Sequence, residues 1–254
     1  MTAPVLRAVM ERRILVNYRV DPGVLAAALP FPFRPMVLEG YGVAGICLIR
    51  LGGLGPVGVP RPLGLTSENV AHRVAVEWDS PDGPVSGVYV PRRDTSSRLA
   101  ALAGGRLFPG RQHRARFSVD EEAGRYRVDV GSRDGATRVI VAAQVASAVM
   151  TGSLFEDTAA ASAFFRCAPV AYTATSHPAV FHGVQLSTDG WHLTPLHVDE
   201  IHSSYFEDPA RFPPGSVKLD SAFLMAGLTT TWHSRPALAL SRTNQPQPCG
   251  SHPR

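Results

Sequence analysis

Arginine is concentrated in one stretch of the chain, between Arg92 and Arg116. Seven arginines fall in this stretch: Arg92, Arg93, Arg98, Arg106, Arg111, Arg114 and Arg116. A guanidinium group can bind a carboxylate through two parallel hydrogen bonds, so this density is typical of an anion-binding wall beside a pocket. The alternative is an arginine-rich surface loop that reflects codon usage, since Lys218 is the only lysine of the chain.

Glu68 and Asn69 are candidate functional residues because of where they stand in the sequence. They lie between a Gly/Pro-rich segment, residues 52–64, and an apolar strand predicted over residues 71–78. A partly desolvated carboxylate beside arginines can act as a general acid or base. The alternative is a pair of hydrogen-bonding residues that closes the loop at the rim of a sheet.

The histidines and cysteines do not predict a metal site. His192, His197 and His202 recur every five residues, a spacing that turns neighbours to opposite faces of a strand and off one face of a helix. No HExxH, GxSxG or phosphate-loop motif is present. Cys47, Cys167 and Cys249 form no CxxC pair, and Cys47 lies in an apolar run that predicts a buried thiol. We therefore expect no metal and no cofactor.

Composition predicts one globular domain over residues 1–241, followed by a disordered polar tail over residues 242–254. Of the 254 residues, 44% are hydrophobic, and the net charge of +4 is scattered without a nucleic-acid-binding motif. No apolar run reaches the ~20 residues of a membrane span, and residues 1–10 do not resemble a signal peptide. We expect a cytoplasmic protein without nucleic-acid or membrane partners; a homo-oligomer is left open.

The elements that position these residues are predicted to be mostly short strands. Strands are expected over residues 14–20, 42–51, 71–78, 85–90, 114–120, 125–130, 137–145, 171–175, 180–187, 191–198 and 203–206. Helices are expected over residues 23–29 with Asp21 as N-cap, over 157–166 with Asp157 as N-cap, and through Ala103 from a cap at Asp94, Thr95 or Ser96. Residues 220–228 fit a strand or a helix, and the strand is favoured. This spacing predicts an antiparallel sheet or barrel, with Ala44, Ile46, Val88 and Val90 buried.

These pieces together resemble the acetoacetate-decarboxylase-like superfamily, and more closely its uncharacterised bacterial YqjF-like branch. The resemblance is carried by residues 14–30, by Glu68, Asn69 and Arg73 in SENVAHRV, and by GVYVPRRDTSS and GGRLFPG. It covers residues 14–149 well and the rest loosely. It implies a mainly β, α+β fold: a single antiparallel, cone-shaped β-barrel with a few short helices around a small-molecule pocket.

In decarboxylases of this superfamily, a lysine after a Tyr-Pro or Phe-Pro pair forms a Schiff base with the keto acid. Here the pair is Phe108-Pro109, and Gly110 and Arg111 follow it. Neither residue can form an imine. Lys218 lies outside the motif, in a predicted exposed Pro/Gly-rich loop, so Schiff-base chemistry is not expected.

The leading functional prediction is a cofactor-independent acid–base enzyme of bacterial secondary metabolism. It would be a lyase, dehydratase, isomerase or cyclase acting on a small carbonyl or carboxylate compound. Glu68 would transfer the proton and Arg111, with Arg93, would bind the anion. The further substrate contacts predicted are Asn69, Arg73, Phe108 and His113. The alternative is a non-catalytic ligand-binding protein that retains the decarboxylase-like fold.

Overall fold

The computed structural model describes residues 5–58, 65–81, 83–102, 110–177 and 180–239 of the chain. Its strands are β1 (Leu6–Val20), β2 (Arg34–Pro35), β3 (Val37–Leu38), β4 (Tyr41–Pro56), β5 (Leu65–Ser80), β6 (Gly83–Thr95), β7 (Gln112–Glu122), β8 (Arg125–Ser132), β9 (Arg138–Val145), β10 (Val170–Ala174), β11 (Val180–Thr188), β12 (Thr194–Ser203) and β13 (Val217–Ala239). The helices are α1 (Pro22–Ala27), α2 (Arg98–Leu102) and α3 (Thr158–Arg166).

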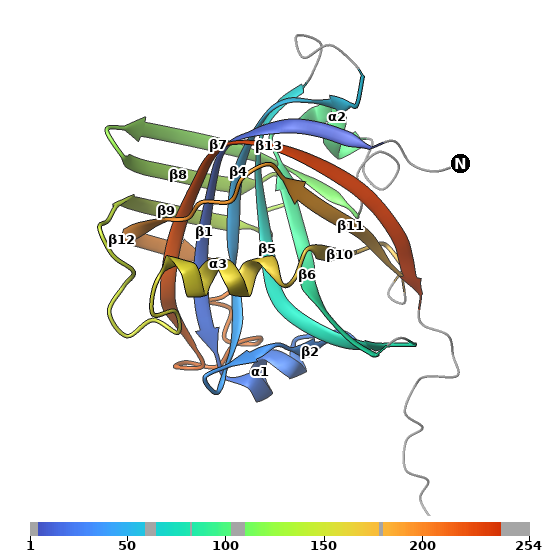
Figure 1. The fold of residues 1–254 in the computed structure, drawn as a ribbon, viewed down its shortest axis with the longest axis vertical. Coiled ribbons are helices and arrows are strands. Elements are labelled where there is room, and N and C mark those ends of the chain that lie inside the picture. Colours follow the sequence, from blue (N-terminus) through green and yellow to red (C-terminus); the bar gives the residue numbers. More distant parts are fainter. Residues whose placement is uncertain (1–4, 59–64, 82, 103–109, 178–179, 240–254) are drawn as a thin grey trace, which may run out of the picture.

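The strands form one 13-stranded sheet that closes on itself (Figure 1). Closure occurs twice, because β6 and β13 each pair with different neighbours along their length. Residues 88–90 of β6 pair with β10 and residues 93–95 with β7, whereas β13 pairs first with β12 and then with β11. Two rings therefore share β13, β1, β4, β5 and β6. The smaller ring closes through β10 and β11, and the larger through β7, β8, β9 and β12.

The predicted mainly β fold with an antiparallel, barrel-like sheet is confirmed. All strand pairs are antiparallel except β6 with β10 and β6 with β7. These two parallel pairs were not predicted, because they join segments that are far apart in the sequence or separated by a helix. Among the described residues, no helix is long and apolar enough to cross a membrane.

The shared strands bury side chains on both faces, since successive residues of a strand point to opposite sides. One face carries Ile14, Val16 and Ile46, which belong to a core continued by β7, β8, β9 and β12. The other face carries Leu15 and Cys47, which pack with Phe155, Ala161 and Phe223. Helix α3 lies across this second face, in front of β1 and β4 (Figure 1).

The burial predicted for four strand residues is confirmed for three of them. Ala44, Ile46 and Val90 are buried. Val88 is only half-buried. It lies where β10 joins β6, at the register pair Ala171–Val88.

Two of the three predicted helix caps are confirmed, and the third is shifted. The Asp21 carboxylate accepts a hydrogen bond from the Val24 amide at 3.0 Å, and Asp157 accepts one from Ala160 at 2.7 Å. For α2 the cap is Ser97, whose hydroxyl accepts from the Ala100 amide at 3.1 Å, rather than Asp94, Thr95 or Ser96. Asp94 is fully buried in an ion pair with Arg92 and is not free to cap.

Several strand boundaries differ from the sequence-based prediction, because pairing partners fix them. The first part of the predicted 52–64 loop is strand, since β4 continues to Pro56 beside β1; residues 59–64 lie outside the described part. β12 begins at Thr194 and ends at Ser203, so the strand predicted over 203–206 is wrong and a turn stands there. Residues 220–228 belong to β13, as favoured, and the tail 242–254 is outside the described residues.

Candidate functional site

A cavity of about 70 Å³ lies between strands of the smaller ring. Its apolar wall includes Ile49 and Leu51 of β4, Val184 of β11 and Trp232 of β13. Ala100 of α2 and Gln112 of β7 also contribute to the lining. This space is large enough for a few water molecules or a small ligand.

The polar lining of this cavity includes Asn69, Arg93 and Cys47. The Asn69 side-chain nitrogen donates to the Ser67 carbonyl at 3.1 Å and the Ser67 hydroxyl at 3.0 Å, which fixes its orientation. Arg93 donates from Nε to the Thr173 hydroxyl at 3.0 Å. Burial lowers the pKa of Arg93 to about 10, so the side chain remains a cation at neutral pH.

Two further arginines, Arg13 and Arg73, lie on the same side of the shared strands. Arg13 Nε donates to the Cys47 sulfur at 3.2 Å. Arg73 is buried, donates to the Asn17 side-chain oxygen and stacks on Phe165 with its guanidinium carbon 5.1 Å from the ring centroid. Burial, together with the charge of Arg13, lowers the pKa of Arg73 to about 10.

Arg13, Arg73 and Arg93 have no carboxylate partner in the described part of the chain. The ion pairs found there join other arginines to acidic residues. Cations out of water are normally paired, because an unpaired buried charge is costly. Asp94 also lines the cavity, but its carboxylate is paired with Arg92. The three arginines therefore leave an excess of positive charge around the cavity, which suits an anion.

Glu68 lies in a different environment from its neighbour Asn69. Its carboxylate accepts hydrogen bonds from Arg12 and from Arg50, each at 2.5 Å, and both arginines also pair with Glu121. The Glu68 side chain is 15% exposed and does not line the cavity. Four charges thus form a closed network between β1, β4, β5 and β7.

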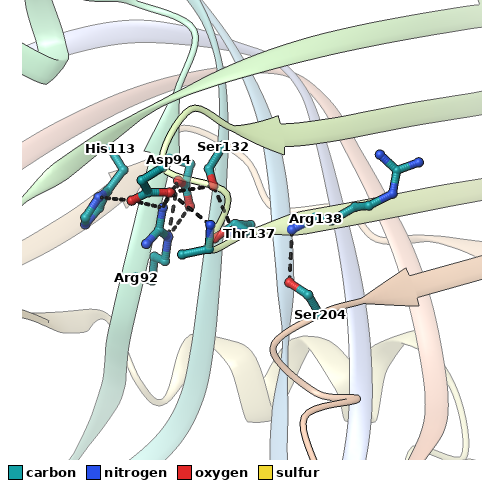
Figure 2. A network of polar contacts seen from close by, with 9 residues as sticks. Arg92, Asp94, His113, Ser132, Thr137, Arg138 and Ser204 are labelled. Carbon is teal, nitrogen blue, oxygen red and sulfur yellow. Dashed lines mark hydrogen bonds and ion pairs between the residues drawn. The ribbon is translucent and has the colours of Figure 1, made fainter.

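The remaining predicted site residues are not gathered at the cavity. Arg111 is exposed just before β7. Figure 2 shows His113 in a network with Arg92 and Asp94, in which its Nδ1 lies 3.1 Å from Asp134. Burial lowers the pKa of His113, with the Arg92 charge adding to the effect. Phe108 lies outside the described residues.

The structure therefore brings Asn69 and Arg93 to one cavity and places Arg73 close to the same region. Sequence reasoning missed Arg13, and it identified Cys47 as a buried thiol without a functional role. Alternation along β1 places Arg13, Leu15 and Asn17 on one face, but only the register with β4 shows that this face meets Cys47. The arginine wall predicted over residues 92–116 is represented at the cavity by Arg93 alone within the described residues.

Lys218 was predicted to lie in an exposed loop, but it lies on β13. It is exposed and pairs in register with Arg19. No group of three or more His, Cys, Asp or Glu side chains that could hold a metal ion is found among the described residues.

Residues 7–215 match the model of the DUF2071 family, described as an uncharacterized conserved protein. The chain belongs to the DUF2071 family. This membership confirms the resemblance predicted from the sequence, because the family is the YqjF-like branch. No curated protein sequence matches the chain.

Solved structures similar to this DUF2071 protein share the acetoacetate-decarboxylase-like fold. The enduracididine biosynthesis enzyme MppR complexed with pyruvate is 12% identical, with coverage of 96% of this chain and 93% of that chain and a TM-score of 0.62. Acetoacetate decarboxylase from Legionella pneumophila is 13% identical, with coverage of 94% and 88% and a TM-score of 0.59. An acetoacetate-decarboxylase-like enzyme from Sphingomonas wittichii RW1 is 12% identical, with coverage of 95% and 94% and a TM-score of 0.56.

Proposed function

We propose that this protein binds a small carboxylate or carbonyl compound in the cavity and acts on it as a cofactor-independent acid–base enzyme. The observation that carries the proposal is Arg93, a cation without a carboxylate partner among the described residues, at the wall of a small cavity. A guanidinium in a partly desolvated cavity can hold a carboxylate or an enolate oxygen. Lyase, dehydratase or cyclase chemistry fits such a site.

A second observation argues against imine chemistry at the position of the superfamily lysine. Gly110 has a φ of +79°, and a Cβ added there would lie 2.1 Å from the Thr173 side chain. No side chain fits at this point without displacing Thr173. The proposed reaction therefore proceeds without a Schiff base at residue 110.

The structures of MppR support the class of ligand. One is complexed with pyruvate, and another with the condensation product of pyruvate and imidazole 4-carboxaldehyde. Pyruvate belongs to the class of small carboxylate and carbonyl compounds proposed here. The alternative is a ligand-binding protein that performs no reaction, which the lack of an imine-forming residue at position 110 favours.

The proposal is tested with a panel of keto acids and hydroxy acids in thermal-shift and calorimetric titrations. Arg93→Met should weaken binding by about tenfold to a hundredfold, since a hydrogen bond to a charged group contributes about 1.5–3 kcal/mol. The matched control is Arg116→Met, because Arg116 is exposed and does not line the cavity. Equal affinities of the wild type and Arg93→Met would contradict the proposal, as would the absence of any ligand in the panel.

Turnover measured by mass spectrometry then separates the enzyme from the binding protein. Glu68→Gln tests the proton-transfer role proposed from the sequence. Its ion pairs with Arg12 and Arg50 favour a structural role instead. Loss of turnover with unchanged unfolding free energy would support the catalytic role of Glu68. Reduced stability with normal turnover per folded molecule would support the structural one.

A further inference from the structure

We infer that Cys47 is a nucleophile directed at this cavity, which bonds covalently to a carbonyl carbon of the anion that Arg93 holds. This inference rests on the proposed function and assigns a role to a residue that the acid–base proposal does not use. It is built on the position of the thiol, on the charges around it and on an unsatisfied donor beside it.

The position of Cys47 combines burial with access to the cavity. The residue is 4% exposed and packs under α3, yet it contributes to the cavity lining together with Arg93 and Asn69. A ligand carboxylate bound by Arg93 would therefore share this small space with the sulfur. By contrast, Cys167 is exposed at the end of α3, and its thiol donates to the Phe164 carbonyl at 2.9 Å.

Three cationic side chains lie around the sulfur. Arg13 Nε donates to the sulfur at 3.2 Å. Arg73 and Arg93 both lie close enough for their charges to interact with Cys47. A thiol attacks through its anionic form, and neighbouring cations stabilise that form. No carboxylate competes for these three arginines within the described ranges.

A buried arginine with an unsatisfied donor lies behind the thiol, on the same face of the shared strands. Arg73 is only 6% exposed, and its buried Nε has no hydrogen-bond partner. Buried donors without partners are uncommon in folded proteins, and an unpaired one on a cation is especially costly. Arg73 does not line the cavity, so it adds positive charge behind the thiol rather than a direct contact to a ligand.

The covalent step needs no further reactant. The Cys47 sulfur attacks the carbonyl carbon, a C–S bond forms, and the carbonyl π pair moves to oxygen. That oxygen takes up the proton released by the thiol, which gives a hemithioketal. Unlike an iminium ion, this adduct provides no electron sink for decarboxylation, so it would anchor and orient the ligand rather than replace the missing lysine chemically.

The test uses bromopyruvate, which carries a carboxylate beside an alkylating carbon. In this probe reaction the sulfur bonds to the CH₂ carbon, bromide leaves, and the thiol proton passes to solvent. Modification is followed for each cysteine by peptide mass spectrometry, and neutral iodoacetamide is the comparison reagent. Cys47 should react with bromopyruvate at least about tenfold faster than Cys167, and pyruvate should protect it, since a tenfold preference needs only about 1.4 kcal/mol of binding.

Arg93→Met provides the decisive variant, because it removes the proposed anion contact and leaves the thiol in place. Loss of the Arg93 charge should slow Cys47 with both reagents, and loss of the anion contact should slow bromopyruvate by about a further tenfold relative to iodoacetamide. An unchanged ratio of the two rates would overturn the inference, as would slower labelling of Cys47 than of Cys167.

Ligand binding distinguishes failure of this inference from failure of the proposed function. If pyruvate stabilises the wild type and Cys47→Ser equally but Cys47 is not labelled, the nucleophile is wrong and the binding site stands. If pyruvate neither binds nor protects and bromopyruvate shows no preference for Cys47, both are overturned.

Discussion

At the scale of single residues, His72 shows how strongly burial can lower the pKa of a histidine that the sequence analysis did not single out. It is almost completely buried on the side of β5 that faces the larger ring, where it stacks on Tyr205 at 4.7 Å between ring centroids. Its Nε2 lies 3.4 Å from the Ser203 hydroxyl, and its Nδ1 has no partner. Burial lowers the pKa of His72 to about 3, and the charges of Arg92 and Arg211 add to this effect.

The lowered pKa of His72 predicts a pH dependence of stability. The unfolded chain binds a proton at this histidine below its ordinary pKa of 6.5, whereas the folded protein does so only near pH 3. The contribution is therefore complete above pH 6.5 and is lost as the pH falls toward 3, at about 1.4 kcal/mol for each pH unit. Urea unfolding of the wild type and His72→Gln between pH 4.5 and 7.5 measures it. Parallel pH profiles of the two proteins would contradict this assignment.

At the scale of elements, the residues that the sequence predicts well are those that act locally. Asp21 and Asp157 cap their helices because a short-range hydrogen bond suffices. The ends of β4 and β12 were misplaced because they depend on partners distant in sequence, β1 for the first and β9 for the second. The same reason explains the site: Arg93 follows from composition, but Arg13 and Cys47 meet only through the pairing of β1 with β4.

The junction of β6, β7 and β10 gives a prediction at this scale. Gly110 has a φ of +79°, and a Cβ there would lie 2.1 Å from the Thr173 side chain. Gly135 has a similar φ of +71°, but a Cβ there would meet nothing within 4 Å. Both alanine variants carry the backbone cost of about 1–2 kcal/mol, and only Gly110→Ala adds a steric one.

The steric term should amount to about 1–3 kcal/mol, the usual cost of overpacking. Denaturant unfolding of Gly110→Ala, with Gly135→Ala as the matched control, measures it as the difference between the two losses. Equal losses would show that Thr173 moves aside freely. In that case the lack of room beside Thr173 would not explain why residue 110 is a glycine.

At the scale of the whole molecule, the double closure of one sheet creates the cavity. Because β6 and β13 each divide between two neighbours, the shared strands have two covered faces instead of one. The strand content and the family resemblance allowed the barrel-like fold to be predicted. The division of the sheet into two rings could not be predicted, because it depends on two short parallel pairings: β10 with β6, and the start of β7 with β6.

The same architecture separates the lysine from the cavity, which gives the last prediction. Lys218 pairs with Arg19 near the start of β13, whereas Trp232, fourteen residues further along this strand, lines the cavity. At about 3.3 Å per residue, the two residues are roughly 45 Å apart along the strand. Lys218 is also exposed, so it lacks the desolvation that makes a lysine nucleophilic at neutral pH.

Borohydride reduction in the presence of pyruvate or acetoacetate should therefore leave Lys218 unmodified, because no imine forms there to be reduced. Peptide mass spectrometry of the wild type, with Lys218→Ala as control, reads out this one residue. A ligand-dependent mass increase on the Lys218 peptide that the alanine variant lacks would show imine formation at Lys218. Such a result would contradict the separation of Lys218 from the cavity that the strand register implies. Schiff-base chemistry would then have to be reconsidered for this protein.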